Sequence, residues 1–576
     1  MAAPAGTNYI GYRTSAHTTL ASLQSTGVEA NGLAVNPLLS GYIPTNGLVN
    51  NNGTPIGVTT DIDGNSRSLT TPDRGAYEFT LGGLDASVSW ISPTSPTSPG
   101  LKTIVVNIAN TQVQTITDIQ IAYNDGGTPV TETFSGLNIT AGNNQNISFT
   151  TQYNLTSSKT ITVNILSVNG GSDAITSNNT VAYFLCIAPS GTYTINSALP
   201  TSGSNFQTFT AAVASLSCGI TGPVTFNVAA GSGPYNEQIT IPVISGASGT
   251  NTITFNCNNV TLTFAGTSGN PNTLALNGAD YITFNNLNVN ATDATYAIAC
   301  HLYGGADNNT FNNCTFTSST TGTTTVLGAF CINGSATSAS ASGNSGNGNI
   351  VNGCTMIGGY YSTVIYGATA SPYNVDNQII NCTVRDFYSY GIYNVYCRNT
   401  LIRGNVVERP NRTNTGTAYC IYLSTSSYNC TVEKNRVRKI FDGQLSSTSA
   451  AYCLYNGASG AAGFENEWIN NLVSDMRSSG SLYGFYSLGY TNVNFYHNTI
   501  SFDHTAATGT TTTYGIYAYG TATDIKNNIV SITRGGTGTK YCMYMSATNT
   551  ATSNYNDLYI NSSGGSNYVG YYSTTF

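Results

Sequence analysis

The amino-acid sequence predicts an all-β fold in which a small β-sandwich is joined to a long solenoid of short parallel strands. Charged residues make up only 7% of the 576 residues, whereas 40% are hydrophobic. Val, Ile, Thr, Tyr and Phe recur in short alternating runs, and these residue types suit a pleated, half-buried surface. From about residue 220 onward, two short motifs recur with a mean spacing of about 30 residues. A folded all-β chain with an internal repeat explains these observations better than a disordered chain does.

The charge of the chain argues against two classes of partner. The net charge is −7, and only 18 residues are basic, so no general electrostatic attraction to nucleic acid or anionic lipid is expected. No apolar run approaches the roughly 20 residues that span a bilayer. The segment 1–6 has neither the basic nor the apolar region of a signal peptide. We therefore expect that a signal peptide has been removed, or that the chain is an excerpt of a longer protein.

A predicted β-sandwich occupies residues 81–188. Its short alternating runs are separated by turns rich in Gly, Asn and Pro, such as Asp125–Gly127. The predicted strands are Ala86–Ile91, Lys102–Ile108, Ile116–Tyr123, Val130–Phe134, Ile147–Phe149, Lys159–Ile165 and Asn179–Phe184. Their number and spacing fit an immunoglobulin-like sandwich without the Cys…Trp…Cys signature. Such a domain is expected to be a spacer or a binding platform.

The first repeated motif, x-Asn/Cys-x-Val/Ile, marks one position in each predicted coil of residues 189–576. The marked column consists of Asn286, Cys314, Cys354, Cys382, Asn405, Asn435, Asn471, Asn498, Asn528 and Asn556. A tight turn between parallel strands leaves backbone groups pointing inward, and an Asn amide pairs with them and with the Asn above and below it. Asn also tolerates the left-handed conformation that such turns need. We expect a buried structural ladder in which Cys fills the slot as a small, weakly polar residue.

The second motif is a pair of tyrosines three residues apart. It occurs as Tyr390–Tyr393, Tyr419–Tyr422, Tyr452–Tyr455, Tyr483–Tyr486, Tyr514–Tyr517, Tyr541–Tyr544 and Tyr568–Tyr571. Residues three apart on a strand face opposite ways, so one Tyr of each pair is expected to pack inward and the other to stand outside. An exposed ladder of tyrosine rings either binds sugars or a neighbouring filament by stacking, or it only stiffens the solenoid through contacts among its own rings. The sequence leaves these alternatives open.

The 13 cysteines are an odd number for a disulfide framework. Cys420, Cys453 and Cys542 stand where other coils have glycine, so they are expected to be packing residues. We predict that most of the thiols are free and buried. Only Cys186 and Cys218, which flank the junction between sandwich and solenoid, are candidates for a disulfide.

The repeat resembles the right-handed parallel β-helix superfamily, which includes pectate lyases and phage tailspikes. A more specific resemblance lies in Asp61–Arg67 (DIDGNSR) and Asp73–Glu78 (DRGAYE). These strings resemble the terminal motif of choice-of-anchor Q proteins, secreted β-helix surface proteins common in Bacteroidota, although Arg74 stands where an aliphatic residue is more usual. The resemblance covers roughly residues 1–80 and 190–576. It implies a right-handed β-helix and an extracellular, cell-surface location far more than any activity.

The two ends of the chain carry similar strings. Residues 7–14 (TNYIGYRT) match residues 566–573 (SNYVGYYS). We therefore expect residues 1–80 to be terminal β-helix coils and a closing motif of a preceding or neighbouring unit. Adjacent copies of the chain would join head to tail, in a tandem array or in a non-covalent filament. The residues predicted for this end-to-end interface are Asn8, Tyr9, Tyr12, Asn567, Tyr568 and Tyr571.

A mixed-sign cluster within residues 403–467 is the main candidate for chemistry. Its members are Arg403, Arg409, Arg412, Lys434, Arg436, Arg438, Lys439, Glu408, Glu433, Asp442, Glu465 and Glu467. Two interpretations of this cluster are open. The resemblance to β-helix lyases implies that an Arg or Lys beside carboxylates abstracts a proton from an acidic sugar. The alternative is that the charges form a lattice of ion pairs on the surface. Glu465 and Glu467, with Asp475 a turn away, also offer a carboxyl pair for glycoside hydrolysis. We favour the lattice and assign no catalytic residue.

One candidate metal site lies near the N-terminus. Asp61 and Asp63, with Asn65 two residues further on, offer oxygen ligands for Ca²⁺. The string lacks the distal Glu of an EF-hand loop, since Pro72 stands at that position, so a turn held by Asx hydrogen bonds is the favoured alternative. No other cofactor is expected.

These features together predict a structural or adhesive unit of a long extracellular surface protein or fibre. Its expected partners are adjacent copies of itself and a polysaccharide. The alternatives are a carbohydrate-active β-helix enzyme, either a polysaccharide lyase or a glycosidase, and a carbohydrate-binding module.

Overall fold

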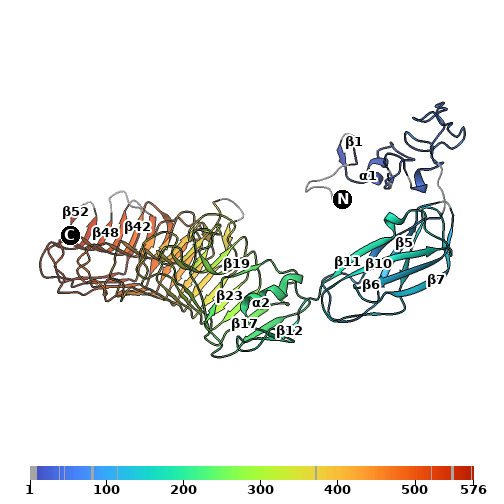
Figure 1. Ribbon diagram of the computed structural model, residues 1–576. Coiled ribbons are helices and arrows are strands. Elements are labelled where there is room, and N and C mark those ends of the chain that lie inside the picture. The colour runs from blue at the N-terminus through green and yellow to red at the C-terminus, as the bar shows by residue number, and fades with distance from the viewer. Residues whose placement is uncertain are drawn as a thin grey trace. The chain divides into compact units, whose positions relative to one another are not determined.

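The computed structural model describes residues 10–13, 15–37, 39, 41–44, 46–79, 84–112, 114–369, 373–519, 522–545, 551–572 and 574–575. The contacts divide the chain into two compact units, residues 1–187 and 188–576, and both are drawn in Figure 1. Asn8 and Tyr9 lie outside the described residues.

The first unit contains a β-sandwich of antiparallel strands. One sheet has the order β3 (Ala86–Ser92), β5 (Val105–Asn110), β8 (Asn144–Ser148), and the other β11 (Thr180–Leu185), β10 (Lys159–Val168), β6 (Ile116–Asn124), β7 (Val130–Ile139). A short pair, β4 (Gly100–Lys102) with β9 (Tyr153–Leu155), and the 3₁₀ turn η2 (Thr176–Asn178) complete it. Strict alternation buries Ile108, Ile121 and Val163 between the sheets. The predicted sandwich is confirmed, although β9 was missed and the predicted strand 102–108 is two strands.

The described part of residues 10–79 contains short elements. These are β1 (Gly11–Arg13), β2 (Ser15–His17), α1 (Leu20–Gln24) and η1 (Gly47–Val49). β1 pairs antiparallel with β2, and the other bridge in this described stretch, between Thr60 and Ser66, is also antiparallel. A three-residue strand gains its hydrogen bonds from the nearest segment, which is the hairpin partner. Tyr12, assigned to the end-to-end interface, is 77% exposed on this hairpin.

The second unit is a parallel β-solenoid with three sheets, which Figure 1 shows as stacks of short strands running from green to red. Sheet A contains β13 (Asn205–Phe206), β12 (Gly191–Ile195), β14 (Val224–Val228), β17 (Ile253–Asn256), β20 (Ile282–Asn285), β23 (Thr310–Asn312), β26 (Ile350–Asn352), β30 (Gln378–Ile380), β34 (Leu401–Arg403), β37 (Thr431–Glu433), β40 (Asn466–Ile469), β43 (Thr491–Tyr496), β46 (Ala522–Lys526) and β49 (Thr552–Asn554). Sheet B contains β15 (Tyr235–Asn236), β18 (Thr261–Phe264), β21 (Asn288–Ala291), β24 (Thr315–Thr317), β27 (Thr355–Ile357), β31 (Thr383–Arg385), β35 (Val406–Glu408), β38 (Arg436–Arg438), β41 (Leu472–Ser474), β44 (Thr499–Phe502), β47 (Ile529–Ile532) and β50 (Asp557–Ile560).

Sheet C carries the tyrosine motif. It contains β16 (Ile239–Pro242), β19 (Asn272–Asn277), β22 (Ile298–Tyr303), β25 (Gly328–Ile332), β28 (Tyr361–Tyr366), β32 (Tyr390–Val395), β36 (Ala418–Leu423), β39 (Ala451–Asn456), β42 (Leu482–Leu488), β45 (Thr513–Tyr519), β48 (Lys540–Met545), β51 (Asn567–Tyr572) and β52 (Thr574–Thr575). Only the pair β51–β52 is antiparallel among the described pairs of these sheets. A short parallel pair, β29 (Asn374–Val375) with β33 (Cys397–Arg398), lies in a turn between sheets C and A.

The interior is a continuous column of apolar side chains. Phe226, Phe255 and Phe284 stack in successive coils with ring centroids 4.8 and 4.7 Å apart, which is the spacing of neighbouring strands. The helix α2 (Phe209–Ala214), which is followed by η3 (Ser215–Cys218), packs on the first coils. The ring centroid of Phe209 lies 5.0 Å from that of Tyr235, and the side chain of Phe209 is fully buried. This helix keeps the apolar end of the column from water, as capping elements of solenoids do.

The cysteines are split between two states. Eleven are free, and all eleven are buried in the solenoid. The two that were singled out for a disulfide, Cys186 and Cys218, are each disulfide-bonded. In the described part of the chain, no helix is long and apolar enough to cross a membrane.

Candidate functional site

The Asn/Cys column lines the interior at the turn before sheet B. Asn405, Asn435, Asn471, Asn498 and Asn528 are at most 2% exposed, as are Cys314, Cys354 and Cys382, whereas Asn556 in the last described coil is half-buried. Each Asn side-chain oxygen accepts the N–H of the column residue in the preceding coil, at 2.8–3.1 Å. The thiol sulfur of Cys354 takes the same place, 3.3 Å from the nitrogen of Cys314. The column therefore holds neighbouring coils together and offers nothing to a ligand.

Asn286 does not belong to this column. It lies at the corner before it, half-buried and with φ 54°, and the buried Leu287 occupies the column position. The assignment was wrong by one residue because Asn also favours the left-handed corner that precedes the column. A second interior ladder of Asn309, Asn349 and Asn377, just before the strands of sheet A, was missed. The Asn that immediately precedes each of β23, β26 and β30 was its signal in the sequence.

The mixed-sign cluster separates into surface ion pairs and buried cations. Arg403 pairs with Glu433 on sheet A, and Arg438 pairs with Glu408 on sheet B at 3.0 Å. Arg409 and Arg412 do not join a surface lattice, because both are buried. The guanidinium group of Arg409 donates to the carbonyl of Ile440, and that of Arg412 donates to the carbonyl of Asp386. These carbonyls do not neutralise the positive charges, but they satisfy the buried N–H donors. Burial lowers the pKa of both to about 10, so they remain cations.

The carboxylates on the outer face of sheet A are held by hydrogen bonds. Glu467 accepts from Asn494 at 2.7 Å, and Glu465 accepts from the N–H of Gly463 at 2.9 Å. Burial alone would raise the pKa of Asp524, but hydrogen bonds led by that of Lys526 outweigh it and lower the pKa below its usual value. A glycosidase needs one carboxyl group with a raised pKa as its general acid. Asp524 therefore suits an ion pair better than acid catalysis.

The candidate calcium ligands lie in a turn that consumes their oxygens. Asp61 accepts hydrogen bonds from the backbone nitrogens of Asp63 and Asn65, from Asn65 Nδ2 and from the nitrogen of Glu78. The hydrogen bond from the Asn65 side chain is the largest of the effects that lower the pKa of Asp61 to about 2. Asp63 is exposed. Among the residues that the structure describes, no group of three or more His, Cys, Asp or Glu could hold a metal ion.

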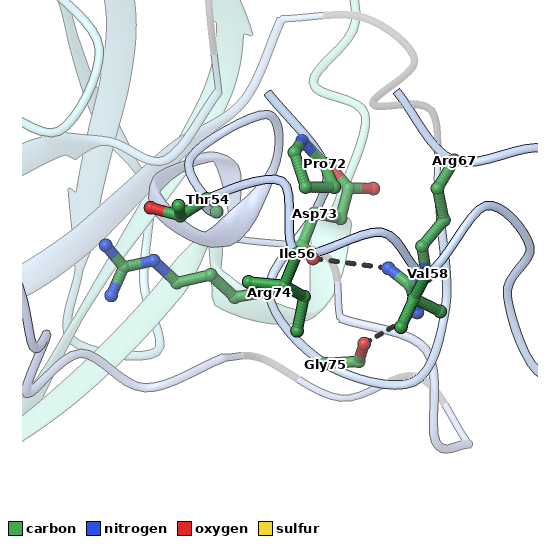
Figure 2. A pocket seen from close by; sticks show the side chains of 9 residues that line it. Thr54, Ile56, Val58, Arg67, Pro72, Asp73, Arg74 and Gly75 are labelled. Atoms are coloured by element: carbon green, nitrogen blue, oxygen red, sulfur yellow. Dashed lines mark hydrogen bonds between the residues drawn. The ribbon is translucent and has the colours of Figure 1, made fainter. Parts of the chain in front are cut away.

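The strings 61–67 and 73–78 fold against each other around Arg67. This side chain forms a salt bridge with Glu78 at 3.3 Å and donates to the carbonyl oxygens of Asp73 and Gly75. Figure 2 shows Arg67 reaching these oxygens, while Arg74 extends the opposite way. Both side chains line a cavity of about 330 Å³. The cavity wall includes Ile56 and Val58, which are 80% and 57% exposed. Arg67 thus has a structural role in this motif.

The tyrosine motif forms a continuous outer surface on sheet C, which we call the tyrosine face. Its first column is Tyr361, Tyr390, Tyr419, Tyr452, Tyr483, Tyr514, Tyr541 and Tyr568, and its second is Tyr393, Tyr422, Tyr455, Tyr486, Tyr517, Tyr544 and Tyr571. Every one of these side chains is half-buried. Asn567 is exposed at the start of β51, where Tyr568 and Tyr571 continue the two columns.

The expectation that one tyrosine of each pair points inward is wrong. In β32, both Gly391 and Ile392 are buried, so the alternation is interrupted and restarts after them. The pairing omits Gly391 and its partner Cys420 alike, so the register stays the same from coil to coil although the alternation changes. Tyr390 and Tyr393 consequently lie on the same outer face, with ring centroids 4.6 Å apart. The Gly/Cys column noted in the sequence marks this interruption of the alternation.

The rings of the tyrosine face are tilted with respect to the solenoid axis. Coils repeat every ~4.8 Å, but aromatic carbons make best contact at roughly 3.5–4.0 Å, so stacked rings tilt by roughly 40° to stay in contact. Within a pair, the two rings are inclined by 27° for Tyr419–Tyr422 and 26° for Tyr452–Tyr455, and they are nearly perpendicular in later coils, at 89° for Tyr483–Tyr486 and 82° for Tyr541–Tyr544. Tilted rings leave part of each face, with the phenol end, open to solvent.

The outer face of sheet C is covered before the tyrosines begin. Over β22 and β25, the outward residues Ile298 and Cys331 are buried with Ala339 from the following loop. The loop is tied down where Asn272 Nδ2 donates to the carbonyl of Ala336 at 2.8 Å, and Asn272 Oδ1 also contacts His301 Nδ1 at 2.7 Å. The tyrosine face therefore begins where this cover ends, at β28.

No family model matches the chain, and no curated protein matches it. Solved structures resemble it in fold. The GH136 lacto-N-biosidase from Eubacterium ramulus is 10% identical, with a TM-score of 0.39, over 65% of this chain and 67% of that one. The catalytic unit of the GH87 α-1,3-glucanase from Streptomyces thermodiastaticus is 14% identical, with a TM-score of 0.27, over 84% and 94%. An alginate lyase from a Paenibacillus species is 12% identical, with a TM-score of 0.25, over 64% and 99%. The parallel β-solenoid itself is seen in the strand pairing, and its structural neighbours are carbohydrate-active β-helix proteins whose likeness concerns the fold alone.

Proposed function

We propose that this chain is a structural and adhesive unit of an extracellular surface protein, and that its tyrosine face holds a polysaccharide without cleaving it. The observation that carries the proposal is the pair of unbroken tyrosine columns, of which the first runs from β28 to β51 and the second from β32 to β51. Tyrosine gives a large, rigid contact area at a low cost in side-chain entropy, and its hydroxyl adds a hydrogen-bonding end. Such a surface suits a ligand that alternates apolar ring faces with hydroxyl groups.

The length of the face favours a polymer over a small molecule. Successive first-column rings lie 4.5–5.5 Å apart from Tyr361 to Tyr568. At ~4.8 Å per coil, the face extends over roughly 35 Å. A repeating sugar chain makes the same contacts at many coils, so weak contacts add up along one ligand.

The composition of the face argues for binding without hydrolysis. Its two columns are tyrosines throughout, whereas glycoside hydrolysis uses two carboxyl groups at either side of the scissile bond. The carboxylates considered above lie elsewhere: Glu467 and Asp524 belong to sheet A, and Glu465 immediately precedes its strand β40. Resemblance in fold to carbohydrate-active proteins supports the sugar part of the proposal only as an analogy.

The proposal is tested by sedimenting the protein with insoluble polysaccharides and measuring reducing ends and unsaturated uronates in the supernatant. We expect depletion of the protein without release of either product. The double variant Tyr452→Ser/Tyr483→Ser should lose binding, whereas Tyr42→Ser, at an 83% exposed tyrosine of the other unit, should bind normally. Release of reducing ends or unsaturated uronates would show that the protein is an enzyme and would contradict the adhesive proposal. Undiminished binding by the double variant would show that the polysaccharide does not bind to the tyrosine face.

The end-to-end joining of copies is part of the same proposal. The similar strings 7–14 and 566–573 support it. Electron microscopy of the full chain should show rods joined in line, and deletion of residues 1–80 should leave single rods. In-line assemblies of the deletion variant would contradict this part of the proposal.

A further inference from the structure

We propose that a cavity beside the tyrosine face binds the negatively charged group of an acidic sugar through Arg398. This inference rests on the proposed function and specifies the class of polysaccharide. The cavity has a volume of about 430 Å³, within the ~300–1,000 Å³ range of small-molecule sites. It is lined by Tyr373, Arg398, Thr425, Ser426, Tyr428, Gly457, Ala458, Ser459 and Tyr490.

The guanidinium of Arg398 is clamped between two aromatic rings. Its central carbon lies 3.6 Å from the ring centroid of Tyr373 and 4.2 Å from that of Tyr428. β33 carries Arg398 into this position by pairing with β29, and an isolated bridge aligns Arg398 with Tyr428 in the next coil. Rings on both faces fix the plane of the guanidinium, so that its N–H groups point outward along its edge.

This cation lacks the partners that Arg403, Arg438 and Arg409 have. Arg403 and Arg438 form ion pairs, and Arg409 donates to carbonyl oxygens. In the described part of the chain, no salt bridge involves Arg398, and its Nε is buried without a hydrogen-bond partner. The carboxylate of Asp376 is close in the chain but accepts from Asn399 at 2.9 Å. Arg398 therefore brings a positive charge without an ion-pair partner to the wall of the cavity, and an anionic ligand would supply the counter-charge.

The rest of the cavity fits the remainder of a sugar. Thr425, Ser426 and Ser459 supply hydroxyl groups, and Tyr490 supplies a ring. No lining residue is acidic, so nothing in the wall repels an anion. A carboxylate or a sulfate ester matches the fork of donors on a guanidinium.

The cavity continues the tyrosine face. Gly457 lines the cavity and lies against the ring of Tyr422, which belongs to the second tyrosine column. A Cβ added to Gly457 would lie only 2.6 Å from that ring, so the lack of a side chain at this position allows the second column to border the cavity. One polysaccharide chain therefore reaches both sites, with its ring faces on the tyrosines and one acidic group at Arg398. The two sites together would select an acidic polysaccharide over a neutral one.

The test compares a panel of uronate-containing and sulfated polysaccharides with their carboxyl-reduced and desulfated counterparts, by surface-immobilised binding. We expect at least one acidic polysaccharide to bind the protein at least tenfold more tightly than its neutral counterpart, and added salt to weaken that preference. Arg398→Gln should abolish the preference. Arg436→Gln, which removes the same charge from an exposed site on β38, should keep it.

A second variant separates loss of the site from loss of the fold. Thr425→Trp places an indole in the cavity from an exposed position and leaves the charge of Arg398 in place, and it should also abolish the preference while the melting temperature stays unchanged. Equal binding of acidic and neutral polysaccharides by the wild type, or a preference that survives Arg398→Gln, would overturn the acidic-sugar inference and leave the tyrosine-face proposal intact. Absence of binding to every polysaccharide would overturn both.

Discussion

The side-chain oxygen of Asn498 accepts two hydrogen bonds from Asn471, one from its backbone nitrogen at 2.8 Å and one from its Nδ2 at 3.0 Å. The Nδ2 of Asn471 also donates to the carbonyl of Val432 in the preceding coil, at 2.9 Å. The side chain of Asn471 therefore bonds two backbone groups of the preceding coil, the N–H of Asn435 and the carbonyl of Val432, and the side-chain oxygen of Asn498 in the following coil. Because these groups are buried, the ladder satisfies donors and acceptors that water cannot reach.

Replacing Asn471 with Leu should destabilise the solenoid by about 1–3 kcal/mol, since buried backbone groups of Asn435 and Val432 lose their partner. The size of the new side chain is not the cause, because Leu287 occupies the same column in its own coil. Urea titration followed by circular dichroism measures the change. Asn312→Leu, on the half-exposed outer side of sheet A, is the control and should cost less than about 1 kcal/mol. Equal costs for the two variants would contradict the buried ladder.

The free cysteines should react only when the solenoid unfolds. Burial raises the pKa of thiols such as Cys331, Cys397 and Cys430. In the folded state the alkylating reagent therefore cannot reach these thiols, and the reactive thiolate form is not populated. Alkylation of the native protein should leave its intact mass unchanged, whereas alkylation in denaturant without reductant should add eleven labels, one for each free cysteine. Rapid labelling of the native protein, or far fewer than eleven labels after denaturation, would show that the thiols do not serve as packing residues.

The sequence allowed the repeating parts of the fold to be predicted, because a period reveals what recurs. The Asn/Cys column recurs from Cys314 onward and the tyrosine pairs recur from β32 onward, and their register follows from the spacing. The outward direction of both tyrosines could not be predicted, because two successive buried residues, Gly391 and Ile392, interrupt the alternation without changing the pattern of letters. Only the regular small residue between the two tyrosines hinted at it.

The Arg398 cavity was missed for the opposite reason. It occurs once in the solenoid, so no period points to it, and its two clamping rings come from Tyr373 and Tyr428, which lie in different coils. Sequence reasoning also placed Arg409 on the surface, where long cations usually lie, although it is buried against backbone carbonyls. A site that breaks a repeat is visible only when the coils are stacked.

The tyrosine face should make the protein sensitive to alkali. Burial, reinforced by the neighbouring phenols, raises the pKa of Tyr486 and Tyr544 to about 12 from an ordinary value of 10.0. A raised pKa in the folded state means that the stabilisation is complete below about pH 10 and is lost as the pH rises toward about 12. Tyrosinate absorbance should therefore rise cooperatively in this range, together with loss of the circular dichroism signal. Smooth ionisation near pH 10 with an intact fold would show that the rings are not shielded by stacking.

A buried carboxyl pair should make the sandwich less stable at neutral pH than in mild acid. Asp85 is fully buried, and burial, followed by the hydrogen bond and charge of Asp173, raises the pKa of Asp85 from 3.8 to about 7. Because the folded state holds the proton more tightly than the unfolded state does, the stabilisation is complete below about pH 4 and is lost as the pH rises to about 7. Asp173 is anchored as the acceptor, since it accepts from the N–H groups of Ala86 and Ile175.

Asp85→Asn should therefore stabilise the sandwich at about pH 8, by on the order of 1–3 kcal/mol, and leave it nearly unchanged at about pH 4. The amide keeps the size of the side chain and donates to Asp173 without a charge. Trp90, which stacks on Tyr183 at 4.9 Å within the sandwich, reports unfolding by its fluorescence in a Trp468→Phe background, since the chain has only 2 Trp. Asp125→Asn, at a half-exposed carboxylate whose pKa is lowered first by the hydrogen bond from Tyr153, is the matched control and should not stabilise. An Asp85→Asn variant that is destabilised at both pH values would show that Asp85 is ionised in the folded sandwich.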